Sequence, residues 1–149
     1  MAYLIDTSIL ARLANSADTF YPVANDAVRE LHRRGELLHV TPQNLIEFRQ
    51  VATRAVALNG LGLSPAEAEA KSALIEATFP LLPETPDIFP LWKTIVEALA
   101  VIGKQVHDAR LVAVCHAHHV SHLLTFNTAH FARFASYRPA MTVVDPASV

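Results

Sequence analysis

Three acidic residues, Asp6, Glu47 and Asp108, are the strongest candidates for chemistry in this sequence. Each acid either directly follows an apolar segment that favours a strand or lies in a helix that comes after such a segment. In a parallel sheet these positions lie near the carboxyl ends of the strands, which would bring the three acids together. Carboxylates gathered in one site repel one another unless a cation lies between them or one of them is protonated. Their oxygens suit Mg²⁺ or Mn²⁺. A divalent cation held in this way favours phosphodiester hydrolysis.

Each acid also has an ordinary structural explanation. Asp6 begins the triplet Asp6-Thr7-Ser8, and any of the three could cap the helix that follows. If Thr7 or Ser8 caps it, the carboxylate of Asp6 is free for another role. Glu47 has Val51 four residues on, so the usual ion pair along a helix is missing, yet such a glutamate is often simply solvated. Asp108 falls in a first helical turn, where the helix dipole favours an acid regardless of function.

A fourth polar residue, Asn127, follows the apolar run Leu123-Leu124. It can cap the next helix, or it can offer a carbonyl oxygen to a cation or to a water. As a neutral residue it would add no negative charge to the site.

Basic residues lie near these positions in the sequence and could hold phosphate groups through charge-assisted hydrogen bonds. Arginines on helices are also commonly solvated, and the sequence does not say which way they point. His107, beside Asp108, is a further candidate for substrate contact. The bases are Arg12, Arg49, Arg54, Lys104, Arg110 and Arg133.

The elements that must position these residues alternate between short apolar strands and amphipathic helices. This alternation predicts an α/β fold with three α/β/α layers and a central, mainly parallel sheet of about five strands. Expected strands cover residues 3–5, 37–40, 122–125 and 141–144, with a weak edge strand at 79–83. Expected helices cover residues 9–14, 23–34, 42–58, 87–101 and 106–119, with a further one after the capping box Ser64–Glu67.

Composition narrows the class of protein. The chain has 149 residues, enough for one domain over residues 1–149, and 52% of them are apolar, a surplus compatible with a buried oligomer or partner interface. The net charge of −2 excludes a protein that coats nucleic acid by charge alone, although residues 64–100 hold −4 and the rest +2. With no membrane-spanning run, no signal segment and one cysteine, Cys115, we expect a cytoplasmic protein without disulfides.

Four motifs, in order along the chain, resemble those of the PIN-domain family, and within it the compact VapC-like toxins of type II toxin–antitoxin pairs. The resemblance covers nearly the whole length of the chain. The matching segments are Tyr3-Leu4-Ile5-Asp6-Thr7-Ser8, Thr41-Pro42-Gln43-Asn44-Leu45-Ile46-Glu47-Phe48, His107-Asp108-Ala109-Arg110-Leu111-Val112-Ala113, and Leu124-Thr125-Phe126-Asn127 with His130-Phe131.

The resemblance implies an endoribonuclease that depends on Mg²⁺ or Mn²⁺ and has a five-stranded parallel sheet. Asp6, Glu47 and Asp108 would be the acidic metal site, with Thr7 and Thr125 as supporting hydroxyls. It also implies a homodimer, silenced by an antitoxin whose C-terminal segment enters the active-site groove.

One residue departs from the family pattern. Asn127 falls where many members have a fourth acid, so a second metal ion should bind more weakly.

Three other readings remain to be weighed. A zinc site at His116, His118, His119 and His122 is disfavoured, because no cysteine or acid completes the ligand set. A phosphatase with Asp6 as nucleophile would need a second acid two residues on, where Ser8 stands. A non-catalytic α/β interaction module, in which the polar residues are only caps, is compatible with the high apolar content and the modest charge.

Overall fold

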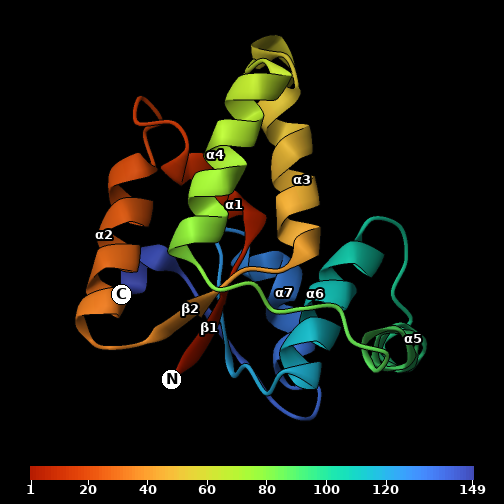
Figure 1. Ribbon diagram of the computed structural model, residues 1–149. Coiled ribbons are helices and arrows are strands. Elements are labelled where there is room, and N and C mark those ends of the chain that lie inside the picture. Colours follow the sequence, from red (N-terminus) through yellow and green to blue (C-terminus); the bar gives the residue numbers. More distant parts are fainter.

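The computed structural model describes residues 1–149 and contains a sheet of four strands, all parallel, in the order β2-β1-β3-β4. The strands are β1 (Ala2–Ile5), β2 (Leu37–His39), β3 (His122–Leu124) and β4 (Thr142–Val144). In this register Tyr3 lies between Leu38 of β2 and His122 of β3. The parallel α/β sheet predicted from the sequence is confirmed, and β1, which ends at Ile5 directly before Asp6, is one of its two central strands. Figure 1 shows how the strands are placed among the helices.

The expected fifth strand at residues 79–83 is wrong. Only Leu81 pairs there, in an isolated bridge to Val40 on the β2 side of the sheet. The amide of Leu82 donates to the carbonyl of Val40, but Pro80 and Pro83 have no amide with which to extend the ladder. The segment therefore runs past the sheet as a strap with one point of pairing.

Seven helices connect and follow the strands. They are α1 (Thr7–Leu13), α2 (Tyr21–Arg33), α3 (Pro42–Thr53), α4 (Pro65–Thr78), α5 (Ile88–Ala98), α6 (Gln105–Ala117) and α7 (Thr128–Ala135). Two short 3-10 turns, η1 (Val56–Leu58) and η2 (Pro146–Ser148), complete the chain.

The first turns of α3 and α4 are held by capping boxes. Thr41 and Asn44 exchange hydrogen bonds at the start of α3. Ser64 and Glu67 do the same at the start of α4, where the sequence predicts a capping box. Each box satisfies amides that have no partner inside the helix. The box of α3 fixes the direction of the helix that carries Glu47.

Helix α3 is shorter than expected, because it ends at Thr53 rather than near Leu58. Arg54 is extended, and the chain then turns back so that the amide of Leu61 donates to the carbonyl of Val51. Gly60 permits this return, since a Cβ there would lie 1.9 Å from the carbonyl oxygen of Arg54. The turn satisfies carbonyls that a longer helix would have bonded.

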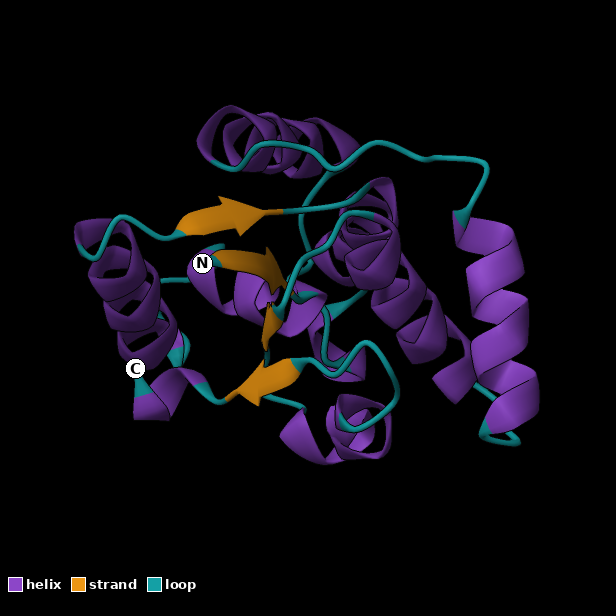
Figure 2. Cartoon of the chain, turned by 90° about the horizontal axis from the view of Figure 1, so that it is seen from below, coloured by secondary structure: helices purple, strands orange, loops and turns teal.

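Two apolar cores lie on opposite faces of the sheet because side chains alternate along β1. Tyr3 and Ile5 join a core with residues of α1, α2, α3 and α4. Leu4 joins a second core with residues of α5, α6 and α7, which includes the buried, unpaired Cys115. Figure 2 shows helices on both sides of the strands, so the predicted three-layer α/β/α arrangement is confirmed.

The helices are all too short or too polar to span a bilayer.

Candidate active site

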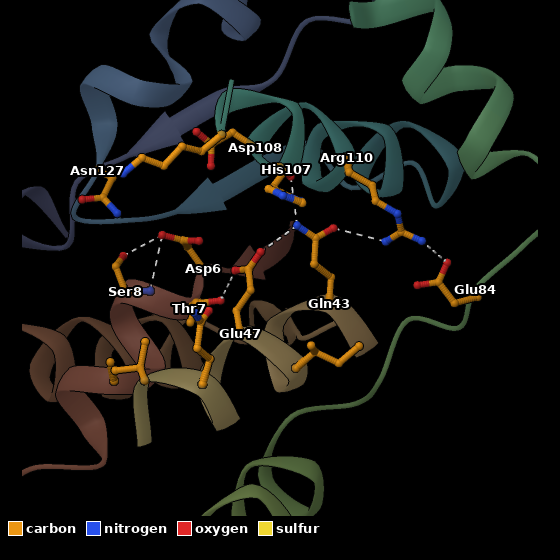
Figure 3. A pocket seen from close by; sticks show the side chains of 15 residues that line it. Asp6, Thr7, Ser8, Gln43, Glu47, Glu84, His107, Asp108, Arg110 and Asn127 are labelled. Carbon is orange, nitrogen blue, oxygen red and sulfur yellow. Dashed lines mark hydrogen bonds and ion pairs between the residues drawn. The ribbon is translucent and has the colours of Figure 1, made fainter. Parts of the chain in front are cut away.

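A pocket of about 820 Å³ opens beyond the end of β1, between α1, α3 and α6. Its lining is mostly polar and includes all four residues singled out from the sequence: Asp6, Glu47, Asp108 and Asn127. Figure 3 shows these side chains around one hollow, although they come from four different segments of the chain. The sheet brings them together because β1 and β3 end at the same edge.

Asp6 is held at the N-terminus of α1, almost completely buried, with 5% of its surface exposed. Its Oδ2 accepts hydrogen bonds from the hydroxyls of Ser8, at 2.6 Å, and Thr125, at 2.7 Å. The amide of Ser8 approaches the same oxygen at 3.4 Å, so Asp6 itself is the N-cap of α1, not spare to it. Only Oδ2 is used in these bonds, which leaves Oδ1 for a ligand.

Two hydroxyls that support Asp6 are themselves oriented by the backbone. Thr125 is fully buried and accepts from the amide of Asn127 at 2.9 Å, so its proton is directed to Asp6. Ser8 accepts from the amide of Phe126 at 3.2 Å in the same way. Thr125 was expected from the sequence and Ser8 was missed, although its position two residues after a capping acid is a usable signal.

Glu47 is anchored through both carboxylate oxygens. Its Oε2 accepts from the hydroxyl of Thr7 at 2.7 Å, and its Oε1 accepts from the side-chain amide of Gln43 at 2.8 Å. Thr7 in turn accepts from the side-chain amide of the buried Asn44 at 3.3 Å. Gln43 was also missed from the sequence, but it precedes Glu47 by four residues and so lies on the same helical face.

Asp108 has no hydrogen bond from any side chain or backbone amide, in contrast to Asp6 and Glu47. It is half-buried in the first turn of α6. Burial, as the largest cause, and the negative charges of Asp6 and Glu47 together raise its pKa to about 6. Asp6 and Glu47 are therefore close enough to disfavour a negative charge on Asp108.

Asn127 stands at the N-cap position of α7, but its side chain makes no capping hydrogen bond. The side chain is exposed and faces the pocket beside Asp108 (Figure 3). The interpretation of Asn127 as an ordinary helix cap is therefore wrong, and its side chain is available to a ligand.

Three of the basic candidates line the pocket: Lys104, His107 and Arg110. Arg110 donates to the side-chain oxygen of Gln43 at 3.1 Å and to Glu84 at 2.6 Å. Glu84 directly follows the strap and lines the pocket too, and nothing in the local sequence points to it. Lys104 forms no ion pair, so its positive charge is not offset by a protein carboxylate.

The other four arginines lie outside the pocket, because tertiary contacts hold them elsewhere. Arg12 pairs with Asp18 at 2.7 Å, and Arg49 pairs with Glu69. Arg54 donates to the carbonyl of Asn59, and Arg133 to Gln105 and the carbonyl of Leu99. The expectation that Arg12 and Arg49 contact the substrate is not supported by this placement.

The donor set of the pocket fits a hard divalent cation. No three His, Cys, Asp or Glu side chains converge closely enough, as they stand, to enclose an ion by themselves. Mg²⁺ retains several waters and usually takes only one or two carboxylates directly. The free Oδ1 of Asp6 and the unbonded carboxylate of Asp108 provide two oxygens of that kind.

Comparison with known proteins places the chain in context. The family model described as PIN domain matches residues 3–137, whereas no curated protein matches the sequence.

Three solved structures have a similar fold. VapBC-1 from nontypeable Haemophilus influenzae is 16% identical, with 98% of each chain covered and a TM-score of 0.70. A toxin–antitoxin complex from Klebsiella pneumoniae is 21% identical, with 97% of each chain covered and a TM-score of 0.64. VapC20 of Mycobacterium tuberculosis, described as a sarcin–ricin-loop-cleaving toxin, is 18% identical, with 87% of this chain and 93% of that chain covered and a TM-score of 0.62.

Proposed function

The chain belongs to the PIN-domain family, and we propose that it is an endoribonuclease dependent on Mg²⁺ or Mn²⁺ and the toxin of a toxin–antitoxin pair. One observation carries the proposal: Asp6, Glu47 and Asp108 line one pocket, and the negative charges of the first two contribute to raising the pKa of the third. A site that concentrates negative charge in this way favours a cation.

Asp6, Glu47 and Asp108 would hold the cation, with the oxygen of Asn127 beside them. A divalent cation, when bound, supplies positive charge to a phosphodiester and lowers the pKa of water in the pocket. Thr125 and Ser8 fix the orientation of Asp6, as Thr7 and Gln43 fix that of Glu47. These donors keep two of the acids in place before any ligand arrives.

Lys104, His107 and Arg110 would hold the phosphate groups of the RNA. All three bring nitrogen donors to the wall that continues from Asp108 along α6. The guanidinium of Arg110 can make two parallel hydrogen bonds to one phosphate. Binding in this way positions the strand and carries no base specificity by itself.

The solved neighbours support a toxin with an antitoxin partner, since one is described as a toxin–antitoxin complex and another as a toxin that cleaves the sarcin–ricin loop. For this chain the RNA substrate, the antitoxin, the homodimer and the cytoplasmic location are parts of the same proposal.

The two alternatives have less support. A phosphatase with an aspartyl nucleophile would need an acid where Ser8 stands, and the Ser8 hydroxyl is instead bonded to Asp6. An interaction module in which the polar residues are only caps does not account for Glu47, inside α3, or for Asp108 and Asn127, which make no capping bond.

The test compares the wild type with Asp6→Asn on end-labelled RNA, with and without a chelator. We expect Mn²⁺-dependent cleavage that the chelator abolishes and that Asp6→Asn lacks. Asp26→Asn is the matched control, because Asp26 is exposed on α2, outside the pocket. Circular dichroism checks that each variant is folded. Equal cleavage by the wild type and Asp6→Asn would overturn the proposal.

A further inference from the structure

Two aromatic side chains form an unexplained surface next to the active site. Phe89 and Trp92 lie on α5, with ring centroids 5.6 Å apart and planes inclined by 26°. Phe89 has 66% of its surface exposed and belongs to neither apolar core. A large aromatic ring in this position gains little from folding, which makes a ligand a natural explanation for it.

Trp92 is held in place by contacts with the rest of the fold. Its indole N–H donates to the carbonyl of Val106 at 2.7 Å, which ties α5 to the start of α6. Its inner side packs against the core that includes Ile95 and Val112. Because the indole is fixed, Phe89 can stack on it and keep a face free.

The hollow beside the aromatic pair shares lining residues with the catalytic pocket. A hollow of about 250 Å³ is lined by Phe89, Trp92, Val106, His107 and Arg110. Two of these, His107 and Arg110, also line the pocket that holds Asp108. In Figure 1, α5 lies beside α6 on the outer side of the molecule. The hollow and the pocket therefore adjoin where α6 carries His107 and Arg110.

We propose that Phe89 and Trp92 form a subsite that stacks one unpaired base of the RNA strand, next to the phosphate held by His107 and Arg110. Aromatic rings stack on bases of any sequence, and donors beside them hold the connecting backbone. The inference rests on the proposed ribonuclease function and names the part of the substrate that lies outside the acidic site. A single-stranded segment is required, since a paired base cannot turn its face to the rings.

Nitrogen donors at the inner end of the hollow favour a nucleotide over a protein side chain as the occupant. The hollow is also lined by only five residues, whereas a stable protein interface involves many more on each partner. A protein partner remains an outcome that the experiment separates.

Trp92 provides a direct probe because it is the only tryptophan in the chain. A short single-stranded oligoribonucleotide is titrated into the protein with EDTA present, so that cleavage does not occur. A second oligomer of the same length carries one abasic ribose, moved along the strand from one titration to the next. We expect the intact oligomer to quench Trp92 fluorescence, and the abasic oligomer to bind more weakly with less quenching at one position of the missing base.

The variants remove the ring and then restore it. Phe89→Ala should weaken oligomer binding by about 5- to 150-fold, and Phe89→Tyr should keep it. Leu58→Ala is the control, because Leu58 is equally exposed, at 66%, and lies in η1 away from the hollow. With Mn²⁺ present, Phe89→Ala should raise KM for RNA and leave kcat nearly unchanged.

The outcomes separate this subsite from the proposed function. Cleavage by the wild type, with unchanged binding and KM in Phe89→Ala, overturns the subsite alone. No cleavage by the wild type overturns the ribonuclease. If Phe89→Ala changes only the mass of the protein in solution and not RNA binding, the rings belong to a protein interface and the subsite is overturned.

Discussion

Asp6 and Glu47 are held by hydroxyl and amide donors, whereas Asp108 and Asn127, across the pocket, have no side-chain hydrogen bond to the protein. We call the first pair the bonded wall and the second the free wall (Figure 3). The hydrogen-bond donors to the bonded wall lie on α1, on α3 and directly after β3, so the fold itself positions its two acids. The free wall holds a half-buried charge with no donor, so it depends on a ligand for its compensation.

This difference implies that changes in the two walls act in opposite directions on stability. Removing a donor from the bonded wall leaves an acid unsatisfied, which costs free energy. Removing the charge from the free wall relieves repulsion and burial. Both changes should reduce activity, so stability and activity together distinguish the walls.

The largest effect is expected for Asp108→Asn. RNA cleavage should fall by more than about 100-fold, because a direct ligand contributes more than the residues that support it. The metal-free variant should melt at a higher temperature than the wild type at pH 7, since burial and the charges of Asp6 and Glu47 raise the pKa of Asp108. Calorimetry in EDTA measures this. A lower melting temperature would show that the charge of Asp108 does not destabilise the folded, metal-free protein.

Thr125→Val should cause a smaller loss of activity, of about 10- to 100-fold, because it removes one of the two hydroxyl donors to Asp6 Oδ2. Unlike Asp108→Asn, it should destabilise the protein by about 1–3 kcal/mol, since Thr125 is fully buried. Chemical denaturation gives this value. Thr142→Val is the control, because Thr142 is exposed on β4. Equal effects in both variants would mean that the hydrogen bond between Thr125 and Asp6 contributes to neither stability nor activity.

The free wall should also make metal binding depend on pH. The pKa of Asp108 is raised from 3.8 to about 6, so its carboxyl keeps its proton to a higher pH in the folded, metal-free protein than in the unfolded chain. The stability that this bound proton contributes is full below pH 3.8 and is lost as the pH rises through 6.

Mn²⁺ must displace that proton, so its apparent affinity should fall by up to about tenfold per unit below pH 6. Titration calorimetry at pH 5, 6 and 7 measures the affinity. The same profile in Asp108→Asn would assign the dependence to another group.

The smallest effect is expected for Glu84→Gln. The carboxylate of Glu84 occupies the place beside Arg110 that a phosphate would take. It accepts a hydrogen bond of 2.6 Å from Arg110, and both groups are partly exposed. Exposed ion pairs are weak, so releasing Arg110 should tighten RNA binding by only up to about fivefold, most at low salt. Fluorescence anisotropy measures the change. Glu76→Gln, on α4 outside the pocket, should leave binding unchanged.

The bonded wall was easier to anticipate from the sequence than its surroundings. Asp6 follows an apolar strand and Thr7 and Thr125 lie in the family motifs, so local patterns identified them. Gln43 could have been found from its spacing to Glu47. Glu84 could not, because it reaches the pocket only through the path of the strap after α4.

Two of the differences between the prediction and the structure share a cause, which is that a local sequence pattern does not reveal tertiary partners. The strap at residues 79–83 differs for a local reason instead: its composition is strand-like, but its prolines limit it to one bridge. Arg12 and Arg49 lie close in sequence to Asp6 and Glu47, but Asp18 and Glu69 hold them away from the pocket. Helix α3 ended early because a distant amide, that of Leu61, took its carbonyl.

The most direct test of the account is the position of Mn²⁺ in crystals of the protein, from anomalous scattering. We predict a peak between the two walls, in contact with Asp6 and Asp108, with the Asp108 carboxylate turned toward the ion. The peak should be absent in Asp108→Asn crystals soaked in the same way. No peak in the wild-type pocket, or a peak only at another site, would contradict the claim that these acids share a cation.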